Sequence, residues 1–569
     1  MDRTAWIAVI LCVVGLFVWE WWLARHAPPR TATATASPTA TPFAEASASP
    51  TPGFTPAAVA TPVPAPTIPP SELKTESLNN SDVELHFTNR GGGIEKAVLL
   101  NHKAEGNENV VLNSAEHAPI GAIVDDPAVP VSSKYGLRRD GDAVVCDFKT
   151  PEDLTIRKKF FFIKTPEAKE NFAVEMDVGL TNSGAKPYTN PGYFIALGSA
   201  TPIHARDYPY YTRLVWCIEG KARDKNVSWF QGGSGFFGVG QRGPQPFYQE
   251  NTAPAEWVAV TNQFFATLIA PLTAKANGVW GRSFSVSAEQ KTLGIDGAMH
   301  MPGFQLEGGQ TYSARFEIYS GPKIYHRLAQ LEHNEAEIMN FGLFKLVSQF
   351  LLNFMNLLHG ALWNSYAAAI LALTTIIRLV LWPLQSKANR SMRQTAALGP
   401  KMQELREKYK DDPTRMNQEV MKLYKQYGIN PVGGCLPMLI QIPIFFGLYQ
   451  MLAQAVELRN AQFFWCHDLS QPDTVGHLPV LGAPINIIPL CMAATQLWLM
   501  QMTPKTGDAT QRRVMMFTPL IFLFFCYNFA AALALYYTAQ NLFSILQFYL
   551  NKRQPMPKLE KVTPAAKRK

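Results

Sequence analysis

The chain has 569 residues, of which 47% are hydrophobic and only 17% charged, and its formal net charge is +8. This length indicates more than one domain, and the low charged fraction suits a mixture of soluble and membrane parts better than a soluble enzyme. The seven cysteines form no CxxC pair and no ligand-like cluster. The cysteine pattern therefore argues against both a zinc site and a disulfide framework.

The N-terminal region carries the first candidate membrane span, the apolar residues 4–24. A cleaved signal peptide is the alternative, but the run is long for one, and the RHAPPR segment after it offers no small-x-small cleavage pattern. We therefore predict an uncleaved transmembrane anchor over residues 1–30. Residues 31–70 are almost all Ala, Thr, Pro and Ser, which cannot bury enough apolar surface to fold. They predict a disordered linker.

Residues 71–340 change to short runs of β-forming residues separated by Gly, Asn and Pro. Clear examples are residues 83–89, 155–163, 172–182 and 314–320. Many strands without intervening helical patterns predict one large antiparallel β-sandwich domain. The histidines of this region are scattered and none is paired with a nucleophile, so no catalytic residue is predicted.

The next segment, residues 341–360, has polar residues that recur at helical spacing opposite Phe and Leu. Such a pattern is typical of an amphipathic helix lying in the membrane surface. A helix buried within a domain would show a similar pattern and remains the alternative. Residues 361–384 then predict the second transmembrane helix, because the apolar run 365–384 reaches the roughly 20 residues that a bilayer requires.

This second helix contains a single charge, Arg378. A guanidinium group keeps its proton, so inside hydrocarbon it needs water, an acidic partner or a lipid headgroup. One interpretation is an arginine that extends to the interface from near the helix end. The other is a positive charge that faces a water-filled cavity inside a helix bundle.

Residues 385–432 predict a basic helical hairpin. Between positions 385 and 430 the sequence has ten Lys and Arg residues and five acidic residues. Apolar residues recur at steps of four, three and four on both sides of Pro413, which indicates two helices joined by a turn. The sets are Leu398, Met402, Leu405, Tyr409 and Met416, Val420, Leu423, Tyr427. Its excess of positive charge places the hairpin in the cytoplasm.

Residues 433–550 predict four more transmembrane helices, and residues 551–569 a basic cytoplasmic tail. The expected spans are Cys435–Leu458, Pro484–Met502, Val514–Leu533 and Ala534–Leu550. The charges of the connecting loops agree with six spans in total, both termini in the cytoplasm and the β domain on the other side. These spans contain prolines and many Gln, Asn and Thr residues, which either bond neighbouring helices or line a wet groove.

Several motifs resemble the YidC membrane protein insertases of the Oxa superfamily. They are Ile376-Ile-Arg378-Leu-Val-Leu-Trp-Pro383, Asn430-Pro-Val-Gly-Gly-Cys435-Leu-Pro-Met-Leu-Ile-Gln441, Val456-Glu-Leu-Arg459, His467-Asp-Leu-Ser470 and Leu535-Tyr536-Tyr537 with Gln540-Asn541-Leu542. The strong resemblance covers residues 343–553. The anchor and the β domain resemble the Gram-negative form in arrangement.

The resemblance implies a five-helix insertase core with a hydrophilic groove open to the cytoplasm and to lipid. It also implies a periplasmic β-supersandwich domain over 71–340 and a location in the bacterial inner membrane. The groove positions that it implies are Arg378, Thr374, Gln441, Phe525 and Tyr536. Implied partners are nascent membrane proteins, membrane lipids, the SecYEG translocon, and the ribosome and signal-recognition-particle receptor through the hairpin and the basic tail. For the tail itself, a topology signal that contacts lipid headgroups is the alternative to a ribosomal RNA contact.

The sequence departs from this family where Asn528-Phe-Ala-Ala-Ala532 replaces the usual Phe-Pro-Ser-Gly turn, which leaves the boundary between the last two spans open. No Walker A motif occurs, and no metal or cofactor is predicted, so we expect an insertase and chaperone rather than an enzyme. The alternatives are a solute transporter and a membrane-anchored carbohydrate-binding protein.

Overall fold

The computed structural model describes most of the chain from residue 72 to residue 552. The described ranges are 72–114, 116–163, 171–204, 206–233, 242–251, 254–286, 292–362, 364–410, 412–429, 436–479, 482–502 and 509–552. The predicted anchor (1–30), the linker (31–70) and nearly all of the basic tail lie outside these ranges. Residues 65–504 and 519–569 form one compact unit, and of the other unit only residues 509–518 are described.

The region from residue 75 to residue 322 is built of β-strands. The strands are β1 (Thr75–Asn79), β2 (Val83–Thr88), β3 (Gly93–Lys103), β4 (Asn109–Leu112), β5 (Ile123–Val124), β6 (Gly136–Asp140), β7 (Ala143–Lys149), β8 (Leu154–Phe162), β9 (Ala173–Asn182), β10 (Tyr188–Ala200), β11 (Arg213–Ile218), β12 (Lys221–Asn226), β13 (Tyr248–Glu250), β14 (Trp257–Thr261), β15 (Phe265–Pro271), β16 (Gly278–Ser285), β17 (Leu293–Leu306) and β18 (Thr311–Pro322). Two short helices, α2 (Val227–Phe230) and α3 (Tyr325–Leu328), accompany them.

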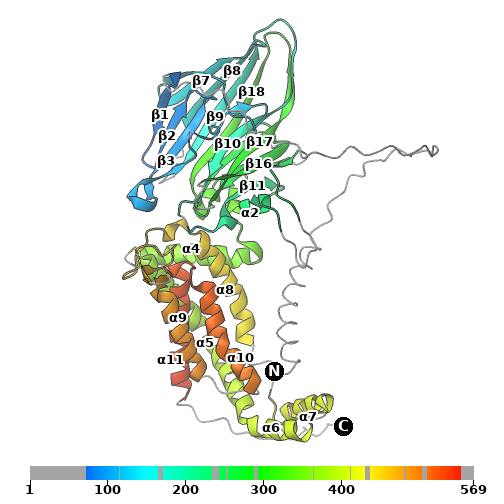
Figure 1. The fold of residues 1–569 in the computed structure, drawn as a ribbon, viewed down its shortest axis with the longest axis vertical. Coiled ribbons are helices and arrows are strands. Elements are labelled where there is room, and N and C mark those ends of the chain that lie inside the picture. Colours follow the sequence, from blue (N-terminus) through cyan, green and yellow to red (C-terminus); the bar gives the residue numbers. More distant parts are fainter. Residues whose placement is uncertain are drawn as a thin grey trace, which may run out of the picture. The chain divides into compact units, whose positions relative to one another are not determined.

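The strands form three antiparallel sheets. The largest has nine strands in the order β12-β11-β14-β15-β18-β9-β8-β7-β6, and the others have the orders β13-β16-β17-β10-β5 and β1-β2-β3-β4. The five-stranded sheet packs on the nine-stranded sheet through β10 and β17. Figure 1 shows β7, β8, β9 and β18 beside one another, with β10, β17 and β16 forming the second sheet. The prediction of an antiparallel all-β region is confirmed, and the four clearest predicted runs coincide with β2, β8, β9 and β18.

Alternating burial explains why these strands pair as they do. Along β9, every second residue from Val174 to Asn182 is buried, so one face of the strand contributes to the core and the other does not. The core also holds large aromatic side chains, among them Trp216, Trp257 and Phe160. A one-residue slip of register would turn this buried set away from the core, so the pattern itself fixes the pairing.

The C-terminal part is helical. Its helices are α4 (Lys345–Ala361), α5 (Tyr366–Ala397), α6 (Gly399–Lys408), α7 (Pro413–Gln426), α8 (Leu436–Gln454), α9 (Ile487–Met502), α10 (Ala509–Cys526) and α11 (Ala531–Lys552), and a small hairpin of β19 (Thr474–His477) and β20 (Pro484–Asn486) lies between α8 and α9. Among the described residues, α5 alone is long and apolar enough to cross a bilayer, while α8, α9 and α10 contain shorter apolar stretches. The count of six spans therefore stays a prediction.

The helix that contains Arg378 is longer than predicted. The predicted span 361–384 covers only part of this helix, because α5 continues through Pro383 to Ala397, and the end of the membrane-spanning part stays a prediction. Gln547 on α11 donates to residues on either side of this proline: its Nε2 is 3.4 Å from the Trp382 carbonyl and 3.2 Å from the Ser386 hydroxyl. The helices α6 and α7 that follow pack around Leu398, Leu423, Tyr424 and Ile429, with Met402, Leu405, Val420 and Tyr427 beside them.

The boundary between the last two helices also differs from the predicted spans 514–533 and 534–550. Helix α10 ends at Cys526, and α11 begins at Ala531. The backbone N–H groups of Ala531 and Ala532 donate to the Gln471 and Leu469 carbonyls at 2.9 and 3.0 Å. These distant carbonyls satisfy the open donors of the new helix, so the turn needs neither proline nor glycine.

Helix α4 packs closely on α8 at one glycine. A Cβ atom on Gly447 would lie 2.9 Å from Val347 Cγ1, and the Ser348 hydroxyl donates to the Gly447 carbonyl at 2.9 Å. On other faces of α4, Leu346, Phe350 and Leu357 are exposed. Apolar side chains of α4 thus lie both against α8 and on exposed faces, and the place of this helix in a membrane surface remains a proposal.

Candidate functional site

Arg378 lies on α5, partly buried, in a bundle where α5 packs against both α8 and α11. Within the part of the chain that the structure describes, the guanidinium has no carboxylate within ion-pair distance. It lies within electrostatic range of the Tyr536 and Tyr537 hydroxyl groups on α11. A partly buried cation without an acidic partner is costly, so such a residue in an apolar helix indicates a functional position.

A polar cluster on the neighbouring helices lies beside this arginine. Gln441 on α8 donates from Nε2 to the Tyr536 hydroxyl at 3.2 Å and to Gln540 Oε1 at 3.3 Å. Tyr536 and Gln540 are both buried. The structure thus brings together three of the predicted site residues, Arg378, Gln441 and Tyr536, from three different helices.

The other two predicted residues are placed differently. Thr374 is buried on α5, and its hydroxyl donates to the Ile370 carbonyl at 2.7 Å, within its own helix. Phe525 on α10 is 65% exposed, and its described ring neighbour is Phe524 at 5.7 Å. The residue of α10 whose ring packs against Tyr537 is Phe522, at 4.9 Å. Phe525 therefore belongs to an apolar exposed surface rather than to the polar cluster.

The polar cluster continues along α11 as a stripe that the sequence reasoning did not single out. Tyr536, Gln540, Ser544 and Gln547 are all buried and follow one another by four, four and three residues. This spacing places them on one face of the helix. The spacing was readable in the sequence, but the burial of that face and its partners on α5 and α8 were not. We name these four residues the α11 stripe.

The arrangement places hydrogen-bond donors, acceptors and the positive charge of Arg378 inside the helical bundle. The groups of the cluster are two amides, a phenol and a guanidinium, which can form hydrogen bonds with polar groups. In the described residues, no cluster of three or more His, Cys, Asp or Glu residues suits a metal ion.

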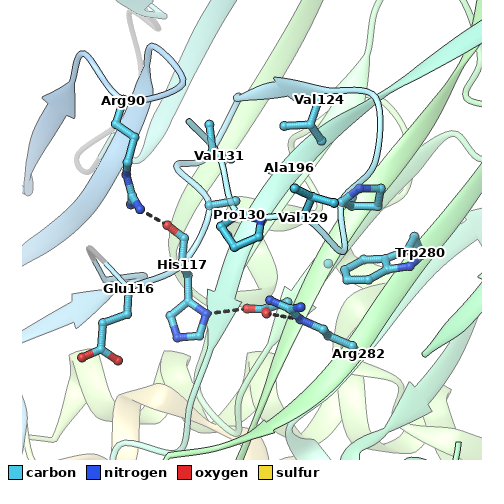
Figure 2. A pocket seen from close by; sticks show the side chains of 16 residues that line it. Arg90, Glu116, His117, Val124, Val129, Pro130, Val131, Ala196, Trp280 and Arg282 are labelled. Carbon is cyan, nitrogen blue, oxygen red and sulfur yellow. Dashed lines mark hydrogen bonds and ion pairs between the residues drawn. The ribbon is translucent and has the colours of Figure 1, made fainter. Parts of the chain in front are cut away.

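A separate small cavity lies in the β domain, lined by Arg90, His117, Trp280, Arg282 and Asp296. Figure 2 shows the His117 ring and the Arg282 side chain directed toward one carboxylate, which is that of Asp296. The distances are 2.7 Å from His117 Nδ1 and 2.9 Å from Arg282 Nε, and Arg90 donates to the His117 carbonyl at 2.7 Å. The charged side chains of this cavity therefore lie against one another.

Two family models match the chain: the YidC periplasmic domain over residues 77–354 and the 60Kd inner membrane protein over residues 357–558. The membrane protein insertase YidC of Nitratidesulfovibrio vulgaris (strain DP4) is 30% identical over 485 residues, which are 80% of this chain and 83% of that relative. The chain belongs to the YidC family. Proteins of the YidC family are insertases and not enzymes, and one of the two matching models carries an inner-membrane name.

Two further YidC proteins are similar to this chain over different shares of its length. The membrane protein insertase YidC of Syntrophobacter fumaroxidans is 40% identical over 301 residues, a match that covers 52% of this chain and spans about half, 53%, of that relative. A crystal structure of an active YidC insertase with its first transmembrane domain resolved covers 85% of this chain and 93% of its own, at 18% identity and a TM-score of 0.35.

Proposed function

We propose that this chain is a membrane protein insertase that moves segments of nascent membrane proteins from the cytoplasm into the lipid bilayer. Family membership supports the insertase class. The observation that carries the mechanism is Arg378, a partly buried cation without an acidic partner in the described structure, beside the Gln441–Tyr536–Gln540 cluster. In this proposal the cluster and the α11 stripe line a hydrophilic groove open to cytoplasm and lipid.

The groove would lower the cost of moving a polar tail across hydrocarbon. An unpartnered backbone polar group in hydrocarbon costs several kcal/mol. Partners within the bundle shorten the distance over which the tail lacks hydrogen bonds, and Arg378 attracts an acidic tail. The exposed apolar side chains of α10, including Phe524 and Phe525, then offer the following apolar segment a path sideways into lipid. The process needs no nucleotide.

The proposal extends to location and partners. The chain would lie in the bacterial inner membrane with both termini and the hairpin of α6 and α7 in the cytoplasm, and with the β domain in the periplasm. Exposed basic residues of the hairpin, such as Lys401 and Lys422, would meet the ribosome and the signal-recognition-particle receptor. The chain would work alone or beside the SecYEG translocon.

Charge-neutral replacement of Arg378 tests the mechanism. In proteoliposomes, Arg378→Gln should slow insertion of a single-span substrate with an acidic tail about tenfold, a loss of ~1.4 kcal/mol of attraction. Arg378→Lys should retain most of the rate, because it keeps the charge. Insertion is measured as protease protection of the tail.

A matched substrate whose tail carries Asn and Gln in place of Asp and Glu serves as the control. Arg378→Gln should affect this neutral tail much less than the acidic one. An equal loss for both tails would show that the arginine supports the fold of the bundle, and no loss for either would remove it from the mechanism.

A further inference from the structure

The loop between α8 and α9 contains a tight aromatic turn, Phe463–Cys466, which we call the aromatic tip. Phe463 and Cys466 exchange two backbone hydrogen bonds, each 2.8 Å long, so Phe464 and Trp465 form the two central residues of the turn. The rings of Phe463 and Phe464 lie 4.6 Å apart, and those of Phe464 and Trp465 lie 6.1 Å apart. Three successive aromatic side chains thus meet at the end of one turn.

The aromatic tip exposes apolar side chains, and one of its residues has an unfavourable backbone conformation. Phe464 is 81% exposed and Trp465 is 42% exposed. Phe464 also has a φ of 48°, a left-handed conformation that is unfavourable for a bulky residue. Such strain persists only where the surroundings hold it, and it is found preferentially at functional positions.

The surroundings that hold the tip are identifiable. Trp465 donates from its indole N–H to Asp473 Oδ2 at 3.0 Å, and the same carboxylate oxygen accepts the backbone N–H of Ile488 at 2.8 Å. Asp473 is buried, and Ile488 lies in the first turn of α9. The tip is therefore tied to the start of α9 through one carboxylate.

We propose that the aromatic tip inserts into the interfacial layer of the bilayer leaflet on the β-domain side and so fixes the depth of the bundle in the membrane. This inference rests on the membrane topology of the proposed function and not on the insertase activity: α8 and α9 fall in two of the predicted spans, so their connecting loop would lie at that interface. Trp and other amphipathic rings favour this layer, where the ring is apolar and the N–H remains bonded.

Charge and size favour lipid over a protein partner. Arg459 is the one Lys or Arg of the loop sequence 455–486, and it is buried, with its guanidinium donating to the Lys103 carbonyl. The loop therefore gives the aromatic tip no exposed Lys or Arg with which to bind an acidic protein surface or anionic headgroups. A stable protein interface buries about 800 Å² on each partner. Three aromatic side chains of about 150–250 Å² each, only partly exposed, do not reach that area.

A fluorescent probe at the tip tests this inference in the full chain. Its native cysteines are replaced, a single cysteine is introduced by Phe464→Cys, and an environment-sensitive dye is attached. In vesicles of phosphatidylcholine and phosphatidylglycerol, we expect blue-shifted emission, strong quenching by lipid that carries a spin label near its headgroup, and little quenching by aqueous iodide. The same dye at exposed Val129 of the β domain, introduced by Val129→Cys, should show the opposite pattern.

A second variant distinguishes membrane insertion by the aromatic tip from insertion caused by the dye itself. Adding Trp465→Asp removes the native anchor, and lipid quenching at position 464 should fall while iodide quenching rises. Unchanged lipid quenching in that variant would mean that the dye itself seeks the bilayer, and iodide quenching without lipid quenching in the first variant would place the tip in water. Either result overturns the proposal. Because no substrate is involved, an inactive insertase with a lipid-quenched tip would refute the proposed function and leave the anchor standing.

Discussion

Burial and like charge control the ionisation of Glu317 in the β domain. Glu317 lies buried on β18, directly opposite Glu175 of β9 in the strand register. Burial, and then the charges of Glu335, Glu332 and Glu175, raise the pKa of Glu317 from 4.5 to about 7. The folded β domain therefore holds this carboxyl group in its protonated form at a pH where the unfolded chain has released the proton.

This shift predicts the pH dependence of stability. Because the folded pKa exceeds the unfolded one, the stabilisation from protonated Glu317 is complete below pH 4.5 and is lost as the pH rises through about 7. Glu317→Gln keeps the neutral form, so it should match the wild type at pH 4 and exceed it by about 3 kcal/mol at pH 8. Chemical unfolding of the β domain, followed by tryptophan fluorescence, measures the difference.

The matched control for this prediction is Glu152→Gln, since Glu152 is exposed. It should leave the difference between pH 4 and pH 8 unchanged. A Glu317→Gln variant that parallels the wild type across this range would show that the carboxyl group is charged in the folded state.

Among elements, the contact between α4 and α8 depends on the missing side chain of Gly447. Gly447→Val should push α4 away, because the new side chain would overlap Val347 and break the hydrogen bond from Ser348. Overpacking of this kind costs about 1–3 kcal/mol. Hydrogen exchange over residues 345–361 should therefore become faster in the variant.

Gly360→Ala, a substitution on α4 itself, provides the comparison. Nothing lies within 4 Å of a Cβ atom at Gly360, so alanine should slow exchange slightly by raising helix propensity. If Gly447→Val left the exchange of α4 unchanged, the close approach of the two helices would be excluded.

The sequence predicted those elements whose pattern is local. The alternation in residues 172–182 predicted β9, and the steps of four and three around Pro413 predicted the apolar positions that pack α6 on α7. The start of α11 was not predictable, because Ala530–Ala532 favour a helix that continues through them. The carbonyls of Leu469 and Gln471, about sixty residues away, accept from the first backbone N–H groups of α11.

For the candidate site, too, the sequence indicated some residues but not the contacts between them. Arg378 stood out because one charge in an apolar run is rare, and family resemblance added Gln441 and Tyr536. Their hydrogen bond joins two helices, which a single sequence does not show. Phe525 was assigned to the groove by resemblance alone, and its exposed ring lies outside the polar cluster.

For the whole molecule, the proposed topology places the β domain and the hairpin on opposite sides of the membrane. Val129 of the β domain and Lys410 beside α6 are both exposed. In a background without other cysteines, Val129→Cys should react with an impermeant maleimide in intact spheroplasts. Lys410→Cys should react only after the membrane is opened. Reaction of both positions from the same side would refute the assignment.

The unbroken course of α5 has a mechanical consequence. Its 32 residues, at 1.5 Å each, make a rod of about 48 Å, and a hydrocarbon layer of about 30 Å leaves a substantial arm outside. Arg378 lies in the middle part of this helix, α6 and α7 follow its C-terminal end, and Gln547 contacts Trp382 and Ser386 on either side of Pro383. A force on the hairpin would therefore be transmitted along α5 to Arg378, which lies in the middle part of the helix.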